Sequence, residues 1–167
     1  MVQIVIMELG MNLITFSLFG DNPLYCQGAV ENANLARVIY PEWTARFYVA
    51  QDVPEDYIKE IEDYGAEVVR CEKKNSYDGL NWRFRPLNDP DVHYWISRDA
   101  DSRLSWRERN AVDEWMESDK SAHLLRDCHN HGFTIMAGMF GINNKLFHER
   151  YGVINLDNAN ANYREAD

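Results

Sequence analysis

Apolar runs and helix-like stretches alternate over the first half of the chain, and this alternation restricts the fold more than any other feature. The runs 13–19, 46–50 and 66–71 are rich in aromatic and β-branched residues, which is typical of strands. Between them, 25–40 and 55–64 carry small or apolar residues at helical spacing. The order strand, helix, strand, helix, strand with short connections predicts parallel strands and right-handed crossovers. We therefore expect an α/β protein with a mostly parallel sheet in a three-layer α/β/α arrangement.

A further apolar run, 93–96, is followed closely by two aspartates, Asp99 and Asp101, with only Ala100 between them. The turn-forming stretch 88–91 precedes the run, which predicts a buried strand with the aspartates in the loop at its exit. There the two carboxylates can converge on one hard cation and leave coordination positions for water or phosphate oxygens. A pair of solvated charges remains the alternative at this point.

Other loops are expected at the same edge of the sheet, because ligands of open parallel sheets bind at the carboxyl ends of the strands. The loops 19–25, 52–54 and 98–103 suit a nucleotide diphosphate, since they offer close backbone approach, stacking rings and forked hydrogen bonds. Arg98 is also expected to offset the charge of the two aspartates when no metal is bound. The candidate nucleotide-binding residues are Ser17, Phe19, Gly20, Tyr25, Asp52, Arg83, Arg98 and Asp99, and the candidate metal ligands are Asp99 and Asp101.

The acidic balance and the cysteines limit the class of protein. A net charge of −10 argues against a nucleic-acid surface, which needs an excess of Lys and Arg, but is compatible with a nucleotide held through a metal. The three cysteines are odd in number and form no C-x-x-C pair, which favours reduced thiols in a cytoplasmic protein. Residues 1–9 lack the basic start of a signal peptide and are too short for a membrane span of about 20 residues. We expect no nucleic-acid partner and no membrane span, and the oligomeric state is left open.

Two kinds of hydrolase also use paired carboxylates. A phosphohydrolase with an aspartate nucleophile places its motif on the first strand, with Thr or Val two places after the second aspartate, whereas here the motif comes late and Arg103, Leu104 and Ser105 follow. A glycoside hydrolase needs carboxyl groups about 5 to 10 Å apart across a sugar. Aspartates at i and i+2 are better arranged to share a cation.

Several segments, taken together and in this order, resemble a family of small nucleotide-sugar glycosyltransferases of the GT-A fold, known from chlorella viruses and microbes. The resemblance extends from about residue 11 to residue 142. The segments that carry it are FSLFGDNPLY at 16–25, YPEW at 40–43, RFYV at 46–49, GLNWRF at 79–84, ISRDADSR at 96–103 and GMFG at 138–141.

The resemblance implies a Rossmann-like nucleotide-binding fold and a divalent ion, Mn²⁺ or Mg²⁺, held by Asp99 and Asp101 against the donor diphosphate. The ion would neutralise charge on the departing nucleoside diphosphate. The implied activity is transfer of a sugar from a nucleotide diphosphate donor to a hydroxyl of a glycan or another acceptor. The expected donor is a UDP-sugar. The alternative is a noncatalytic nucleotide-sugar-binding remnant that lacks acceptor elements.

On this interpretation the chain is one domain with a short C-terminal acceptor half. Enzymes of this fold often complete the metal shell with a late histidine, and His129, His131 and His148 give no recognisable match to it. Asp127 and His131 lie where an acceptor-side loop is expected, and either could deprotonate an acceptor hydroxyl; a plain polar loop is the alternative. The expected parts are a possible extension at 1–10, the nucleotide-binding half at 11–104, the acceptor-side half at 105–152 and a polar tail at 153–167.

Overall fold

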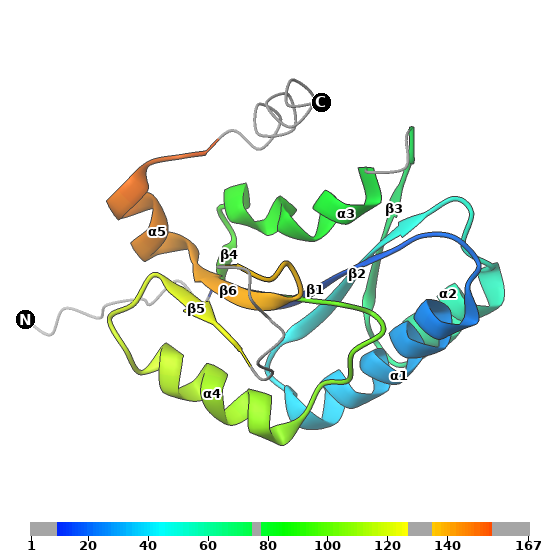
Figure 1. Ribbon diagram of the computed structural model, residues 1–167, viewed down its shortest axis with the longest axis horizontal. Coiled ribbons are helices and arrows are strands. Elements are labelled where there is room, and N and C mark those ends of the chain that lie inside the picture. Colours follow the sequence, from blue (N-terminus) through cyan, green and yellow to red (C-terminus); the bar gives the residue numbers. More distant parts are fainter. Residues whose placement is uncertain (1–9, 75–77, 127–134, 155–167) are drawn as a thin grey trace, which may run out of the picture.

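The computed structural model describes residues 10–74, 78–126 and 135–154, which form a six-stranded sheet covered by helices on both faces (Figure 1). The strand order across the sheet is β3-β2-β1-β4-β6-β5. The strands are β1 (Met11–Leu18), β2 (Thr44–Ala50), β3 (Glu67–Cys71), β4 (Val92–Arg98), β5 (Ala122–Leu124) and β6 (Met139–Asn143). The helices are α1 (Pro23–Ile39), α2 (Glu55–Asp63), α3 (Asp78–Asn81), the 3₁₀ helix η1 (Trp82–Asn88), α4 (Trp106–Met116) and α5 (Asn144–Tyr151).

The predicted α/β architecture is confirmed. The strands β3, β2, β1 and β4 are parallel neighbours, and α1 and α2 connect the first three of them. Beyond β4 the sheet continues with β6 and β5, which pair antiparallel, and the strand β6 was not predicted from the sequence. The sheet is therefore mostly parallel, with an antiparallel addition at one edge.

The two faces of the sheet carry separate apolar cores. On β1, Ile14, Phe16 and Leu18 point into a core shared with α1, α2 and α4, while Leu13 points to the other face, where η1 and α5 lie (Figure 1). Small side chains on α1, such as Ala29, let that helix lie close to the sheet. The three-layer arrangement follows from this alternation of side chains on the strands.

Local signals set the ends of the helices. The side chain of Asn22 accepts a hydrogen bond from the Leu24 backbone N–H at 3.0 Å, and Pro23 begins α1. Ser105 caps α4 in the same way through the N–H of Glu108. Gly65, at a φ of 83°, follows the end of α2, as expected of a glycine just past a helix.

The topology determines where a ligand can bind. From β1 the chain moves outward to β2 and β3 and then returns to β4 on the other side of β1. Strand order therefore reverses between β1 and β4, and ligands of open α/β sheets bind outside the carboxyl ends of the strands at such a point. The loops that follow β1 and β4 meet there.

Two further expectations concern cysteines and membranes. Cys26 and Cys71 are free thiols, whereas Cys128 lies outside the described residues, as do residues 1–9 and most of the polar tail. Within the described ranges, no helix has the length and apolar character that crossing a bilayer requires.

Candidate nucleotide and metal site

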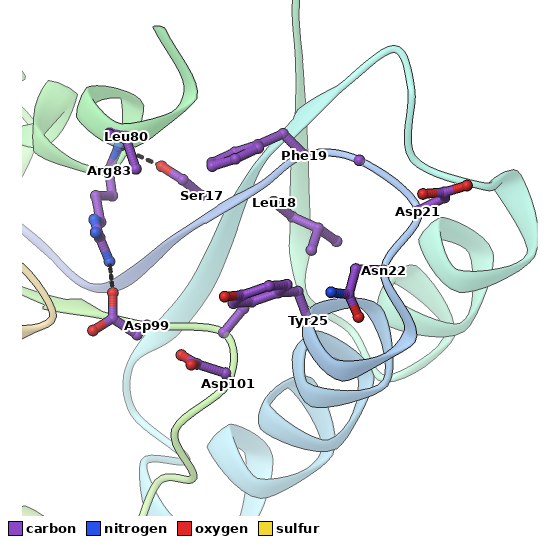
Figure 2. A pocket seen from close by; sticks show the side chains of 12 residues that line it. Ser17, Leu18, Phe19, Asp21, Asn22, Tyr25, Leu80, Arg83, Asp99 and Asp101 are labelled. Carbon is purple, nitrogen blue, oxygen red and sulfur yellow. Dashed lines mark hydrogen bonds and ion pairs between the residues drawn. The ribbon is translucent and has the colours of Figure 1, made fainter. Parts of the chain in front are cut away.

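A cavity of about 460 Å³ opens at the carboxyl ends of β1 and β4 (Figure 2). Of the residues predicted to bind nucleotide or metal, all but Asp52 and Arg98 line it. The structure thus brings together side chains from β1, the loop after it, α1, η1 and the Asp-X-Asp loop. The lining residues are Ser17, Leu18, Phe19, Gly20, Asp21, Asn22, Tyr25, Leu80, Arg83, Asp99, Ala100 and Asp101.

Two aromatic rings face the open space of this cavity. Figure 2 shows Phe19 and Tyr25 directed toward the same space, with Arg83 and the two aspartates beside it. The ring of Phe19 rests on Gly79, where an added Cβ would lie 2.3 Å from a ring carbon, so the glycine allows this packing. Tyr25 is 41% exposed, which leaves its ring accessible to a planar ligand group.

Hydroxyl groups of β1 hold the backbone of Arg83. Thr15 and Ser17 lie on the same face of the strand, two residues apart. The Oγ1 of Thr15 donates to the carbonyl of Arg83 at 2.9 Å, and the Oγ of Ser17 accepts from its N–H at 3.2 Å. This residue of η1 is thereby fixed at the rim of the cavity.

The guanidinium of Arg83 connects η1 to the Asp-X-Asp loop. It donates to the carbonyl of Arg98 at 3.1 Å and forms an ion pair with the carboxylate of Asp99 (Figure 2). The Arg83 side chain is only 9% exposed, whereas that of Asp99 is 42% exposed. The Asp99 carboxylate therefore has a cationic partner within the protein and remains accessible from the cavity.

Asp99 and Asp101 offer carboxylate oxygens to one cavity, while Ala100 between them is buried against the core. Among the described residues, no group of three or more His, Cys, Asp and Glu side chains is placed to hold a metal. Two carboxylates with free coordination positions fit a hard divalent cation, Mg²⁺ or Mn²⁺, which also binds water and phosphate oxygens. The donor set is thus compatible with the metal expected from the sequence.

Arg98 does not lie in the cavity, and the expectation that it offsets the charge of the aspartates is wrong. Consecutive residues at the end of a strand point to opposite faces, so Arg98 points toward Glu108 of α4 while Asp99 points toward Arg83 of η1. Its guanidinium pairs with Glu108 and donates to the carbonyls of Ser97 at 2.7 Å and Phe140 at 3.1 Å. Arg83 instead provides the positive charge beside Asp99.

Asp52 lies next to the cavity and supports the loop after β1. Its carboxylate accepts from the Gly20 N–H at 2.8 Å and from the Lys73 ammonium at 2.8 Å. The hydrogen bond from Lys73, followed by that from Gly20, lowers the pKa of Asp52 below its ordinary value. Contact of Asp52 with a base or ribose stays a prediction, and Asp127 and His131 lie outside the described residues.

Sequence reasoning missed several residues that contact the Asp-X-Asp loop, among them Gly138 and Asn32. A Cβ on Gly138 would stand 2.0 Å from Oδ2 of Asp99, and Asn32 of α1 hydrogen-bonds the backbone of the loop. Gly138 was noted only as part of a segment with a family likeness. Asn32 is a polar residue on the same helix face as Ala29 and Ala36, and a polar residue on a buried stripe was the available signal.

No family model matches this sequence, and no curated protein matches it. Its structure is similar to the mannosyltransferase PcManGT from Pyrobaculum calidifontis in complex with GDP-Man and Mn²⁺, with a TM-score of 0.59 at 9% identity over 89% of this chain and 48% of that one. The chain has the GT-A glycosyltransferase fold. The apo form of the glycosyltransferase GlyE of Streptococcus pneumoniae TIGR4 aligns with a TM-score of 0.56 at 16% identity, over 94% of this chain and 39% of that one.

The galactosyltransferase LgtC, in complex with donor and acceptor sugar analogs, gives a TM-score of 0.54 at 14% identity, over 93% of this chain and 64% of that one. This chain therefore spans about half the length of the first of these enzymes and less than two thirds of the others. The shared part is the GT-A fold that places the cavity between β1 and β4.

Proposed function

We propose that this protein is a metal-dependent glycosyltransferase that moves a sugar from a nucleoside diphosphate donor to a hydroxyl acceptor. The donor that we propose is a UDP-sugar. One observation carries the proposal: Asp99, Asp101 and Arg83 line a single cavity with the loop after β1, at the switch point of a GT-A sheet. The glycosyltransferases of the same fold support it. The proposal also rests on the resemblance of the sequence segments to small GT-A enzymes of chlorella viruses and microbes.

In this proposal each part of the cavity binds one part of the donor. The aromatic rings of Phe19 and Tyr25 offer surfaces for the base, and the backbone around Gly20 allows the ribose and diphosphate to approach closely. Asp99 and Asp101 would hold a divalent cation, which supplies positive charge to the departing nucleoside diphosphate. Arg83 provides a further cation. Its backbone is held in place by hydrogen bonds to the hydroxyls of Thr15 and Ser17.

The acceptor hydroxyl has to lose a proton as the glycosidic bond forms. Asp127 and His131 remain our candidates for the base, because in the sequence they lie between β5 and β6, the strand next to β4. In Asp127→Asn or His131→Ala we expect the loss of the base to lower kcat while UDP affinity is unchanged.

The test combines isothermal titration calorimetry with a donor-hydrolysis assay. We expect UDP to bind the wild-type protein more tightly with Mn²⁺ than without it, and UDP-sugars to be hydrolysed slowly. Asp99→Ala should abolish the effect of Mn²⁺ and the turnover, whereas Asp119→Ala, at an exposed aspartate outside the cavity, should change neither. Titration of GDP in parallel tests whether the protein prefers uracil as the nucleobase of the donor.

Two outcomes would contradict this proposal in different ways. Metal-dependent UDP binding without turnover on any donor would favour the noncatalytic nucleotide-sugar-binding protein. No binding of any nucleoside diphosphate in the presence of metal would exclude both functions.

A further inference from the structure

Helix α1 holds the backbone of the Asp-X-Asp loop through one buried side chain. Asn32 is 0% exposed. Its Nδ2 donates to the carbonyl of Ser102 at 2.7 Å and to that of Ala100 at 3.3 Å, and its Oδ1 accepts from the Leu104 N–H at 3.1 Å. One amide group therefore satisfies three backbone groups of a segment that has no ladder partners of its own.

Gly28, one turn earlier on α1, brings the same loop into direct contact with the helix. A Cβ at this position would lie 2.1 Å from the carbonyl oxygen of Ala100. Ala100 itself is buried in the core that α1 shares with the sheet. Ala100, the central residue of the Asp-X-Asp motif, therefore packs against α1, and Asp99 and Asp101 on either side of it face the cavity.

The other polar connections of residues 100–104 are weaker or more exposed. The Ser102 N–H bonds the carbonyl of Asp99 at 3.2 Å within the turn, and Arg103 pairs with Glu31 at the surface, where the Glu31 side chain is 58% exposed. Exposed ion pairs contribute little because water and salt screen them. The buried amide of Asn32 is consequently the main polar link between residues 100–104 and the scaffold, whereas Arg83 holds the preceding residue, Asp99.

We propose that Asn32 is a positioning residue for the metal site: by holding residues 100–104, it keeps Asp101 beside Asp99, so that both carboxylates line one cavity and can bind the same cation. This inference rests on the proposed function. Asn32 lies outside the cavity lining and acts only through the backbone of the loop. Its loss should therefore weaken metal binding and leave the metal-independent contacts of the nucleotide unchanged.

The chain offers a matched control in Asn144 on the opposite face of the sheet. Asn144 is also buried, at 4% exposure. Its Nδ2 donates to the carbonyls of Pro86 at 2.7 Å and Val92 at 3.0 Å, and its Oδ1 accepts from the Trp95 indole at 2.9 Å. Replacing either asparagine removes a comparable set of buried hydrogen bonds, but only Asn32 contacts the Asp-X-Asp loop.

The experiment measures Mn²⁺ affinity in the presence of UDP, UDP affinity without metal, the EPR spectrum of bound Mn²⁺ and the melting temperature. In Asn32→Ala we expect Mn²⁺ affinity to fall about tenfold, UDP affinity without metal to stay within about twofold, and the EPR spectrum to change. Asn144→Ala should lower the melting temperature to a similar extent and leave all three binding readouts at wild-type values.

Asn32→Asp provides a second variant of the same shape. Its carboxylate still accepts from the Leu104 N–H but cannot donate to the carbonyls of Ala100 and Ser102, so it should also weaken Mn²⁺ binding. The inference would be overturned if an Asn32 variant that folds bound Mn²⁺ as tightly as the wild type. It would also be overturned if Asn144→Ala lost as much Mn²⁺ affinity as the Asn32 variants. If the wild-type protein showed no metal-dependent UDP binding, the proposed function would fail, and this inference with it.

Discussion

Gly138 lies directly against the carboxylate of Asp99, since a Cβ added to the glycine would stand 2.0 Å from Oδ2. The preceding residue, Ala137, accepts a hydrogen bond from the Ser97 hydroxyl at 2.6 Å. The loop before β6 is therefore bound to the end of β4 and closes one side of the Asp99 carboxylate. At this position only a glycine leaves the carboxylate where it is.

We expect Gly138→Ala to weaken metal-dependent UDP binding about tenfold or more, because the methyl group has to displace the Asp99 carboxylate. Calorimetry with Mn²⁺ and UDP measures this change. Gly65→Ala is the control: its positive φ makes the substitution destabilising by about 1 kcal/mol, yet no atom lies within 4 Å of the added Cβ. Full Mn²⁺ affinity in Gly138→Ala would show that the carboxylate is not a ligand.

Arg83→Gln should lower UDP affinity about tenfold, since it removes the cation beside Asp99 and one charge-assisted donor for the diphosphate. The measurement is UDP titration at constant Mn²⁺. Arg85→Gln removes a cation from the same helix that stacks near Tyr48 and Trp82 outside the cavity, and it should bind as the wild type does. Equal effects of both substitutions would point to loss of net charge alone.

Glu108→Ala should destabilise the fold by about 3 to 5 kcal/mol, because it leaves the buried guanidinium of Arg98 without its partner. The two side chains are 5% and 13% exposed. Urea denaturation measures the loss, and Glu55→Ala, which breaks the exposed pair with Arg70, should cause little or no change. A small effect at Glu108 would mean that water reaches Arg98 in the folded protein.

His123 makes stability depend on pH below neutrality. Burial, followed by the charge of Arg98, lowers its pKa from 6.5 to about 4, and its Nε2 has no hydrogen-bond partner among the described residues. Above pH 6.5 the ring is neutral in both the folded and the unfolded state. As the pH falls from 6.5 to about 4, the unfolded chain takes up the proton first. The free energy of unfolding therefore decreases by up to about 1.4 kcal/mol per pH unit.

His123→Phe should remove this part of the pH dependence and keep the stacking on Trp115, whose ring centroid lies 5.3 Å from that of the histidine. Urea denaturation at about pH 7.5 and about pH 5 measures the difference for both proteins. The loss of stability between the two pH values should be smaller in the variant. An equal loss would mean that His123 binds a proton as readily in the folded chain as in the unfolded one.

Most of the fold was predictable because its signals are local. The strands and helices up to β4 follow from side-chain periodicity, and Asn22, Ser105 and Gly65 mark helix ends through interactions within a few residues. The strand β6 was missed because its five residues, Met139–Asn143, include a glycine and show no strict alternation. Its strand character comes from pairing with β4.

The site was only partly predictable for the same reason. Loop position alone placed Phe19, Tyr25 and the two aspartates on one edge of the sheet. The direction of Arg98 could also have been inferred, because adjacent strand residues point to opposite faces. The pairing of Arg83 with Asp99 could not be inferred from the sequence, because it joins two elements whose packing no local pattern describes.

The sequence by itself determined the alternation of strands and helices, the loop that carries Asp99 and Asp101, and the small central Ala100. These depend on neighbours along the chain. Only the tertiary structure decided that Arg83 neutralises Asp99, that Gly138 leaves room for its carboxylate and that Asn32 holds the loop. Those contacts join segments far apart in the sequence, so they exist only once the packing of η1, β6 and α1 on the sheet has brought them within a few ångströms.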